Sequence, residues 1–389
     1  MELSQLIIGL PPYHFANAKK KIADRVAAGV DVISLSMGDP DLPAPQAVLD
    51  RLSETLQDSV NHRYPEYRGM PALHQAFAAW FQRRFGVELE PEVEMLPLLG
   101  SKEGLIYLGA AVLNAGDIAL TGDPYYPAYL TAATNVGAQP YLLPLLEQND
   151  YLPDLESIPA DVLRKARLLW LNYPNNPTAA TAGREFFEQA VEFARQHNLV
   201  IVHDMAYAEV YFDDWRPMSI LQIPGAKEVA VELHSLSKTY NMAGFRVGML
   251  VGNAKLVDAV GRLKSNIDSG MFRPVQYAAI TALELPDAWI QERNAIYRRR
   301  RDLLVDGFNE LGLRTRRTQA GLYVWSAVPA GSTSRDFANW LFDETGVFVT
   351  SGTNFGQAGE GYLRVSMTES QERLETALIR MRGALRARA

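Results

Sequence analysis

Between residue 72 and about residue 285, apolar runs that predict strands alternate with amphipathic stretches that predict helices. Such alternation is typical of a mainly parallel sheet covered by helices on both faces. Five of the predicted strands end in turns that carry polar residues or glycine. Because open parallel sheets bind ligands beyond the carboxyl ends of their strands, we expect a functional site at these turns.

A chain of 389 residues exceeds one ordinary hydrophobic core, so two domains are expected. After about residue 286 the alternation gives way to a long helix and a few shorter elements, which predicts a smaller α+β unit. We therefore predict an N-terminal arm with part of the small domain over residues 1–44, a large domain over 45–285 and a C-terminal small domain over 286–389. The expected fold class is α/β.

The composition excludes several kinds of function. A net charge of −7 argues against a nucleic-acid surface, and the basic run Arg298–Arg301 is therefore interpreted as a solvated helix face. The absence of cysteine excludes disulfides, thiolate metal sites and a cysteine nucleophile, and it fits a cytoplasmic protein. No apolar stretch approaches the length of a membrane span, and the short run Leu6–Leu10 is not a signal peptide. No metal site is predicted.

The most informative stretch follows a predicted buried strand at Val229–Leu233, where a polar loop carries Ser235, Ser237 and Lys238. An amine directed into a protein pocket needs a partner or a lowered pKa, and a lowered pKa makes it a good nucleophile toward an aldehyde. Arg246 follows in the same stretch, and its planar guanidinium suits a phosphate. We therefore predict an imine between Lys238 and pyridoxal phosphate. The alternative is an ordinary surface loop.

Two other turns predict groups that such a cofactor needs. Ser101 and Lys102 follow a glycine at the start of a predicted helix, where free backbone N–H groups favour an anion. The alternative for Ser101 is a plain helix N-cap. Asp204 ends a predicted buried strand, and a buried carboxylate needs a positive partner, which a protonated pyridine nitrogen supplies.

The motif Ser235-Leu-Ser-Lys238, followed by Gly244-Phe-Arg-Val-Gly248, resembles the lysine motif of class I and II aminotransferases, the fold-type I pyridoxal phosphate enzymes. The resemblance covers nearly the whole chain and is greatest to LL-diaminopimelate aminotransferases of the shorter bacterial type. The supporting stretches are residues 10–15, 37–43, 62–69 and 264–270. The resemblance implies a large cofactor-binding domain with its central sheet between helices, plus a smaller α+β domain.

The resemblance also implies roles for individual residues around the cofactor. Lys238 would be the catalytic residue, and Tyr126 would stack on the ring, whereas Tyr125 and Tyr129 are expected to be packing residues. Asn176 and Tyr207 would hydrogen-bond the ring oxygen. The residues implied to bind the phosphate are Ser101, Lys102, Ser235, Ser237 and Arg246, with Tyr64 reaching the phosphate of a partner subunit. For Tyr64 the alternative is an ordinary packing residue.

Substrate contacts are implied for Gly38, Arg364, Asn176 and Tyr13. Arg364 would bind the α-carboxylate of the substrate, and an intramolecular ion pair is the alternative. Gly38 would leave room for that carboxylate, or would serve only a tight turn before proline. At residue 179 the family usually has glycine, and alanine at this position predicts a slightly different loop geometry.

The implied activity is the transfer of an amino group between two pairs of compounds, glutamate with 2-oxoglutarate and an amino acid with its oxo acid. Ping-pong kinetics are expected. LL-Diaminopimelate is the expected amino acid, in lysine biosynthesis. Alanine, methionine or aromatic aminotransferases and a β-lyase of the same fold are the alternatives, and a transcriptional regulator would need a basic DNA-binding segment. The expected protein is a cytoplasmic homodimer with shared active sites that binds neither nucleic acid nor membranes.

Overall fold

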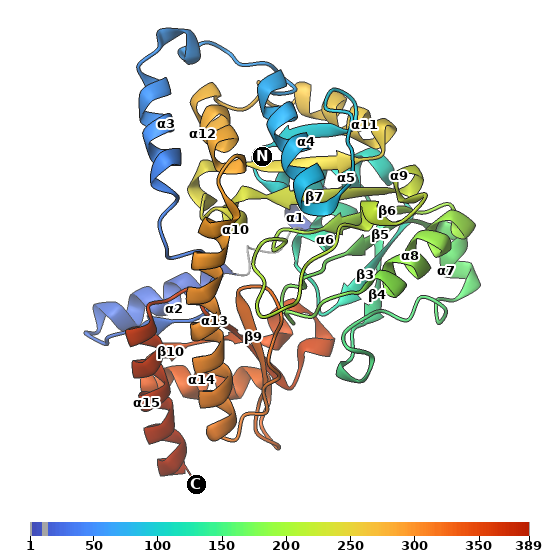
Figure 1. Cartoon of the computed structure of the whole chain (residues 1–389). Helices are drawn as coiled ribbons and strands as arrows, with labels where there is room; N and C mark the ends of the chain where they lie inside the picture. The colour runs from blue at the N-terminus through green and yellow to red at the C-terminus, as the bar shows by residue number, and fades with distance from the viewer. Residues whose placement is uncertain (1, 10–14, 389) are drawn as a thin grey trace. The chain divides into compact units, whose positions relative to one another are not determined.

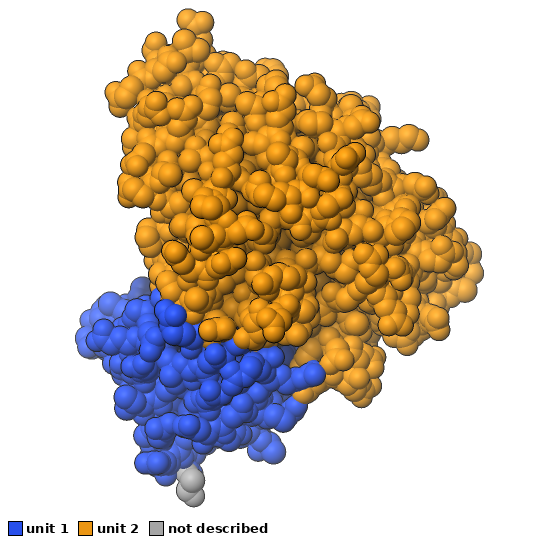
Figure 2. Space-filling model, viewed as in Figure 1, with its two compact units in different colours: residues 1–38, 299–317, 323–389 blue, residues 39–298, 318–322 orange. Residues whose placement is uncertain are grey.

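The computed structural model describes residues 2–9 and 15–388. The chain divides into two compact units, which Figure 2 colours separately. The smaller unit comprises residues 1–38, 299–317 and 323–389, and the larger unit comprises residues 39–298 and 318–322. The domain boundaries that were predicted after residues 44 and 285 stay a prediction.

The larger unit contains a seven-stranded sheet with the strand order β2-β8-β7-β6-β5-β3-β4. Figure 1 shows β7, β6, β5, β3 and β4 side by side in this order. These five strands are parallel, whereas β8 runs antiparallel to both of its neighbours. The strands are β2 Met95–Leu98, β3 Ile118–Asp123, β4 Gln139–Pro144, β5 Ala166–Leu171, β6 Val200–Asp204, β7 Ala230–Ser235 and β8 Gly248–Gly252. The predicted α/β class with a mainly parallel sheet is confirmed.

Helices cover both faces of this sheet because successive strand residues point to opposite sides. In β5, Leu168 and Trp170 belong to the core that includes residues of α5, α6 and α11, whereas Leu169 and Leu171 belong to the core with α4, α8 and α12. The helices of this unit are α3 Gln46–Leu56, α4 Pro71–Phe85, α5 Ser101–Val112, α6 Ala128–Thr134, α7 Ala160–Lys165, α8 Arg184–His197, α9 Ala226–Val229, α10 Leu236–Thr239, α11 Ala254–Ser265 and α12 Arg273–Leu283.

The smaller unit contains a three-stranded antiparallel sheet, order β11-β12-β9, and a short parallel pair of β1 and β10. Its elements are α1 Gln5–Gly9, α2 Phe15–Ala27, β1 Ile33–Ser34, β9 Tyr323–Ala327, α14 Ser334–Thr345, β10 Val347–Phe348, β11 Thr350–Ser351, β12 Tyr362–Ser366 and α15 Gln371–Arg388. Within residues 2–9 and 15–388, no helix combines the length and apolar character that a membrane span requires.

The long helix α13, Asp287–Glu310, carries the basic run that the sequence analysis interpreted as a solvated face. That interpretation is wrong for two of its members, because Arg300 and Arg301 are only 5% and 1% exposed. Arg301 donates from Nε to the neighbouring carboxylate of Asp302 at 2.8 Å, and Arg300 donates to the Met367 carbonyl. These arginines are part of the interior of the smaller unit.

Candidate active site

Lys238 lies on a single helical turn at the carboxyl end of β7. Ser235, the last residue of β7, caps this turn, because its hydroxyl accepts a hydrogen bond from the backbone N–H of Ser237 at 3.2 Å. The hydroxyl of Thr239 returns to the Ser235 carbonyl at 2.9 Å. The stretch predicted as a polar loop is therefore the short helix α10, and Lys238 projects from an ordered turn.

Two glycines allow the start of α5 to approach the strand that follows Arg246. A side-chain carbon on Gly100 would collide with the guanidinium of Arg246, and one on Gly248 would lie 2.5 Å from the backbone nitrogen of Ser101. Arg246 donates to the Ala243 carbonyl at 2.9 Å and reaches the Ser237 hydroxyl at 3.5 Å. The fold thus brings Ser101, Ser237 and Arg246 together, as the sequence analysis expected.

Lys102 adds a second cation to this cluster. Its pKa lies below the usual value because part of the side chain is buried and because the Arg246 charge is nearby. Both side chains remain open to solvent. Two cations beside helix N–H groups and serine hydroxyls form a cradle that favours a phosphate dianion.

Asp204 ends β6, the strand beside β7, and its side chain is only 5% exposed. Oδ2 accepts a hydrogen bond from the Tyr129 hydroxyl at 2.9 Å. Oδ1 is buried and has no hydrogen-bond partner of ordinary geometry in the part of the chain that the structure describes. Burial raises the pKa of Asp204, so a cationic N–H donor at Oδ1 would satisfy both its charge and its open acceptor.

Tyr129 is a site residue that the sequence analysis missed, because it was expected only to pack. It does pack, with its ring stacked on Trp170 at a centroid distance of 5.3 Å, but its hydroxyl holds the Asp204 carboxylate. Burial and the Asp204 charge raise its pKa well above the usual range, so the hydroxyl stays a donor. The available signal was its position three residues after Tyr126, close to one helical turn.

The turn after β5 is fixed to the end of β6 by Asn172. Its amide donates to the Asp204 carbonyl at 2.7 Å, and its oxygen accepts from the backbone N–H of Asn176 at 2.8 Å. Asn176 is consequently buried. Ala179 adopts a positive φ of 58° in this turn. The turn thus holds a non-glycine residue in the left-handed region, which glycine adopts without strain, and the expected difference in loop geometry stays a prediction.

The other predicted site residues of the larger unit differ in how much of their side chains is exposed. Tyr126 is partly buried, with its ring edge-to-face against Tyr129 at 5.8 Å, and Tyr207 is only 6% exposed. Tyr64 is 83% exposed. An exposed tyrosine of this kind is available to another molecule.

A buried carboxylate supports the two strands that carry Asp204 and Lys238. Glu232 of β7 is hydrogen-bonded to His203 of β6 at 2.9 Å and to His234 at 2.6 Å, and it accepts from the Ser219 hydroxyl at 3.0 Å. Burial alone would raise the pKa of Glu232, but the hydrogen bonds from both histidines outweigh it and hold the pKa at about 2. Glu232 is therefore ionised wherever the protein is folded near neutral pH.

In the smaller unit, Tyr323 contacts both Gly38 and Arg364. The Arg364 guanidinium lies 4.1 Å from the Tyr323 ring centre and 4.4 Å from that of Phe355, and it donates to the Ser36 carbonyl at 2.5 Å. A side-chain carbon on Gly38 would collide with the Tyr323 hydroxyl. Glycine is thus required at residue 38 for the approach of Tyr323. Tyr13 lies outside the described residues.

Comparisons with known proteins agree on one family. Residues 30–381 match the family of aminotransferases of class I and II. The LL-diaminopimelate aminotransferase of Dehalococcoides mccartyi strain 195 is 50% identical over 98% of this chain and 98% of its own. That of Desulforudis audaxviator is 48% identical over 97% of each chain. The substrate-bound structure of BacF from Bacillus subtilis superposes with a TM-score of 0.95, at 38% identity and 98% coverage of both chains.

These matches extend over nearly all of the chain, in the sequence and in the fold. Enzymes of this family generally depend on pyridoxal phosphate and act on amino acids and oxo acids. The central sheet, the lysine turn and the anion cradle described above are features of a protein of this kind. The chain belongs to the class I and II aminotransferases, with the fold of the fold-type I enzymes.

Proposed function

We propose that this protein is a pyridoxal-phosphate-dependent LL-diaminopimelate aminotransferase. It would transfer an amino group between glutamate with 2-oxoglutarate and LL-diaminopimelate with tetrahydrodipicolinate, in lysine biosynthesis. The observation that carries the cofactor assignment is the buried Oδ1 of Asp204, to which no residue in the described part of the chain donates with ordinary geometry, and a protonated pyridine nitrogen would be such a donor. The substrate assignment is supported by relatives with this name that are 48–50% identical over nearly the whole chain.

The residues present fit pyridoxal phosphate. When bound, this group supplies an aldehyde and an electron-withdrawing ring. Lys238 would hold the aldehyde, Asp204 the ring nitrogen, and Tyr126 the face of the ring. Asn176 and Tyr207 would donate to the ring oxygen. The phosphate would be held by Ser101, Lys102, Ser235, Ser237 and Arg246. Of these, Ser101, Lys102, Ser237 and Arg246 form the cationic cradle described above.

Proton transfer is the work of the chain's own groups. The ε-amine of Lys238 would take the proton from the α-carbon of the substrate as a general base. It would later give that proton up as a general acid. Asp204 would keep a proton on the nitrogen that faces Oδ1, and Tyr129 would keep that carboxylate in place. Because the first oxo acid would leave before the second one binds, ping-pong kinetics are expected.

Substrate orientation is assigned to Gly38, Arg364, Asn176 and Tyr13. Support comes from Arg364, a guanidinium that is 2% exposed and held between two aromatic rings, which suits a two-pronged bond to an α-carboxylate. Fixing the carboxylate leaves the α-proton as the group that is lost. Gly38 would contribute by admitting Tyr323 next to this guanidinium.

A homodimer with shared active sites is also part of the proposal. Large apolar side chains are exposed around two neighbouring segments that the Arg273–Glu66 ion pair joins. They are Val60, Tyr64, Tyr67, Ile267 and Phe272, each at least 43% exposed. A cluster of this kind is typical of an interface, and Tyr64 would reach the phosphate bound by the partner. Light scattering on the eluted protein should give twice the mass of one chain.

The proposed activity is tested with a panel of amino donors and 2-oxoglutarate. LL-Diaminopimelate should give glutamate at least tenfold faster than alanine, methionine or phenylalanine at equal concentration. The Lys238→Ala protein should give none and should lack the visible absorbance of the parent. A higher rate with alanine, methionine or phenylalanine would replace the substrate assignment while leaving the cofactor chemistry intact.

Two further readouts separate this activity from other chemistry of the fold. Pyruvate and ammonia released from cystathionine would indicate a β-lyase. A colourless parent protein that binds no pyridoxal phosphate would overturn the cofactor assignment itself. A cytoplasmic location stays a prediction, which fractionation of producing cells would test.

A further inference from the structure

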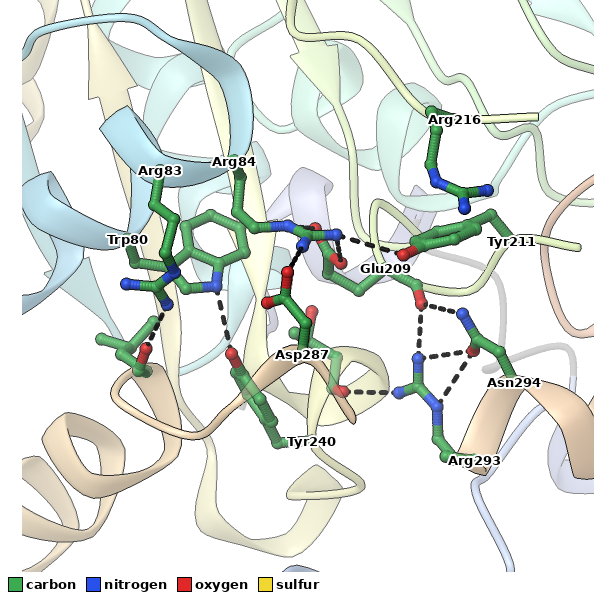
Figure 3. Close-up of polar contacts among 12 residues, drawn as sticks. Trp80, Arg83, Arg84, Glu209, Tyr211, Arg216, Tyr240, Asp287, Arg293 and Asn294 are labelled. Carbon is green, nitrogen blue, oxygen red and sulfur yellow. Dashed lines mark hydrogen bonds and ion pairs between the residues drawn. The ribbon is translucent and has the colours of Figure 1, made fainter. Parts of the chain in front are cut away.

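Arg293 of α13 is a buried guanidinium that donates to three backbone carbonyls, two of which belong to the lysine turn. Nη1 lies 2.5 Å from the carbonyl oxygens of Lys238 and Thr239, and Nη2 lies 2.5 Å from that of Glu209. The side chain is only 3% exposed. Figure 3 shows the guanidinium directed toward Glu209, with Asn294 beside it.

The two carbonyls of the lysine turn need an outside donor because they close a helix of one turn. The last carbonyls of a helix have no partner within it, and a cation at that end also matches the helix dipole. Ser235 caps the other end of α10. The turn that carries Lys238 is therefore held at its start by a serine and at its end by Arg293.

The same guanidinium fixes the segment that follows Asp204. Glu209 lies five residues after Asp204, and Tyr207 lies between them. Asn294 also donates to the Glu209 carbonyl, at 2.9 Å, while its oxygen accepts from Arg293 at 2.8 Å. Arg293 thereby joins the main chain of two segments that carry proposed cofactor contacts.

The donors of Arg293 lie on main-chain carbonyls and on the amide oxygen of Asn294. The carboxylate of Glu209 is bound by Arg84, at 3.0 Å and 2.6 Å, and Arg84 also pairs with Asp287 at 3.0 Å (Figure 3). Burial lowers the pKa of Arg293 to about 10. Burying a charged guanidinium costs free energy. Because the donors of Arg293 lie on the carbonyls of the lysine turn, we interpret Arg293 as more than a packing residue.

We propose that Arg293 is a positioning residue for Lys238, holding the main chain of the lysine turn so that the ε-amine meets the α-proton of the substrate. This inference rests on the proposed role of Lys238 as the proton-transfer group. Arg293 would touch neither substrate nor cofactor. Because small displacements of a reacting group cost rates about 100-fold, loss of this hold should lower kcat more than it changes KM.

Arg293→Met removes the donors at similar volume, and Arg293→Lys restores a cation with fewer donors. Arg83→Met is the control, because the exposed Arg83 also donates to a carbonyl at the end of a helix, that of Leu283, the last residue of α12, at 2.8 Å. Each protein is assayed with LL-diaminopimelate and 2-oxoglutarate. Backbone amide exchange is measured by mass spectrometry on the cofactor-free proteins.

For Arg293→Met we expect kcat to fall between about 10- and 100-fold with KM changed less than threefold, and amide exchange to rise in residues 236–242. Arg293→Lys should recover part of kcat. Arg83→Met should keep kcat within about twofold and raise exchange only near the end of α12. A folded Arg293→Met protein with kcat within twofold of the parent, or with exchange raised evenly along the chain, would overturn the proposal.

Two arrangements keep the result interpretable. If Arg293→Met does not fold, Arg293→Lys and Asn294→Ala take its place, since Asn294 orients the guanidinium. In both variants, a lowered kcat together with raised amide exchange in residues 236–242 supports the proposal. A kcat and an amide exchange like those of the parent overturn it. If the parent itself does not use LL-diaminopimelate, the proposed function fails, and the local rise in exchange alone then decides whether Arg293 holds the lysine turn.

Discussion

The hydroxyl of Tyr129 lies 2.9 Å from Oδ2 of Asp204 and donates a hydrogen bond to it, inside the larger unit where both side chains are buried. The other carboxylate oxygen, Oδ1, is left as an acceptor. Tyr129 therefore fixes which oxygen of Asp204 is available to a ligand.

Tyr129→Phe should lower kcat about tenfold or more, because a hydrogen bond to a charged group contributes about 1.5–3 kcal/mol and the Asp204 carboxylate would lose its orientation. Steady-state kinetics with the preferred amino donor would measure it. Tyr141→Phe on edge strand β4 is the control and should leave kcat unchanged. Equal rates for Tyr129→Phe and the parent would show that the hydroxyl has no catalytic importance.

Gly100→Ala should weaken pyridoxal phosphate binding at least tenfold, because the added carbon would push the Arg246 guanidinium out of the cradle. Gly116→Ala is the matched control: both glycines have φ near 87°, at 86° and 87°, but Gly116 has no atom within 4 Å of the added carbon. Both variants should lose about 1–3 kcal/mol of unfolding free energy, since alanine is strained at positive φ. Titration of each cofactor-free protein, followed by absorbance, gives the affinities. Similar affinities for the two variants would contradict the prediction.

Ala179→Gly should change the unfolding free energy by less than about 1 kcal/mol, because relief of the positive φ is offset by the flexibility of glycine and the loss of a buried methyl group. Ala179→Val should lose roughly 2 kcal/mol or more, since a branched side chain at φ 58° is strained. Urea unfolding followed by circular dichroism would measure both. A valine variant as stable as the parent would rule out this conformation of the turn.

Acid should unfold the parent protein partly through Glu232. Its pKa of about 2 in the folded protein lies below the ordinary value of 4.5. A lowered carboxyl pKa stabilises the folded state above pH 4.5, and this contribution, about 3 kcal/mol, is lost as the pH falls toward 2. Urea unfolding at pH 5, 4 and 3 should therefore show a steeper loss for the parent than for Glu232→Gln. Glu54→Gln on the exposed face of α3 should keep the slope of the parent.

Local patterns predicted much of the fold and the site. The buried strand predicted at Val229–Leu233 corresponds to β7, and the long helix predicted after about residue 286 is α13. Asp204 was singled out because a carboxylate at the end of a buried strand needs a positive partner. By contrast, β4 was not predicted, because it carries two prolines and only one of its residues is buried.

Contacts between residues far apart in the sequence could not be predicted from local sequence patterns. The need for glycine at residue 38 arises from Tyr323, which the sequence places 285 positions later. The hold of Arg293 on Lys238 spans 55 positions, and a basic residue in a long helix predicts only a solvated face. The hydroxyl of Tyr129 was missed because stacking and hydrogen bonding use the same residue type.

Asp204 and Leu233 are register partners on adjacent parallel strands, and the lysine turn begins just beyond Leu233. The backbone spacing between such strands is about 4.8 Å in every sheet, whatever side chains the strands carry. The main-chain distance between the segments that carry Asp204 and Lys238, the proposed partner of the ring nitrogen and the proposed base, is thus set by a constant of protein architecture. Loops that contact the substrate can therefore change through evolution or engineering without altering that distance.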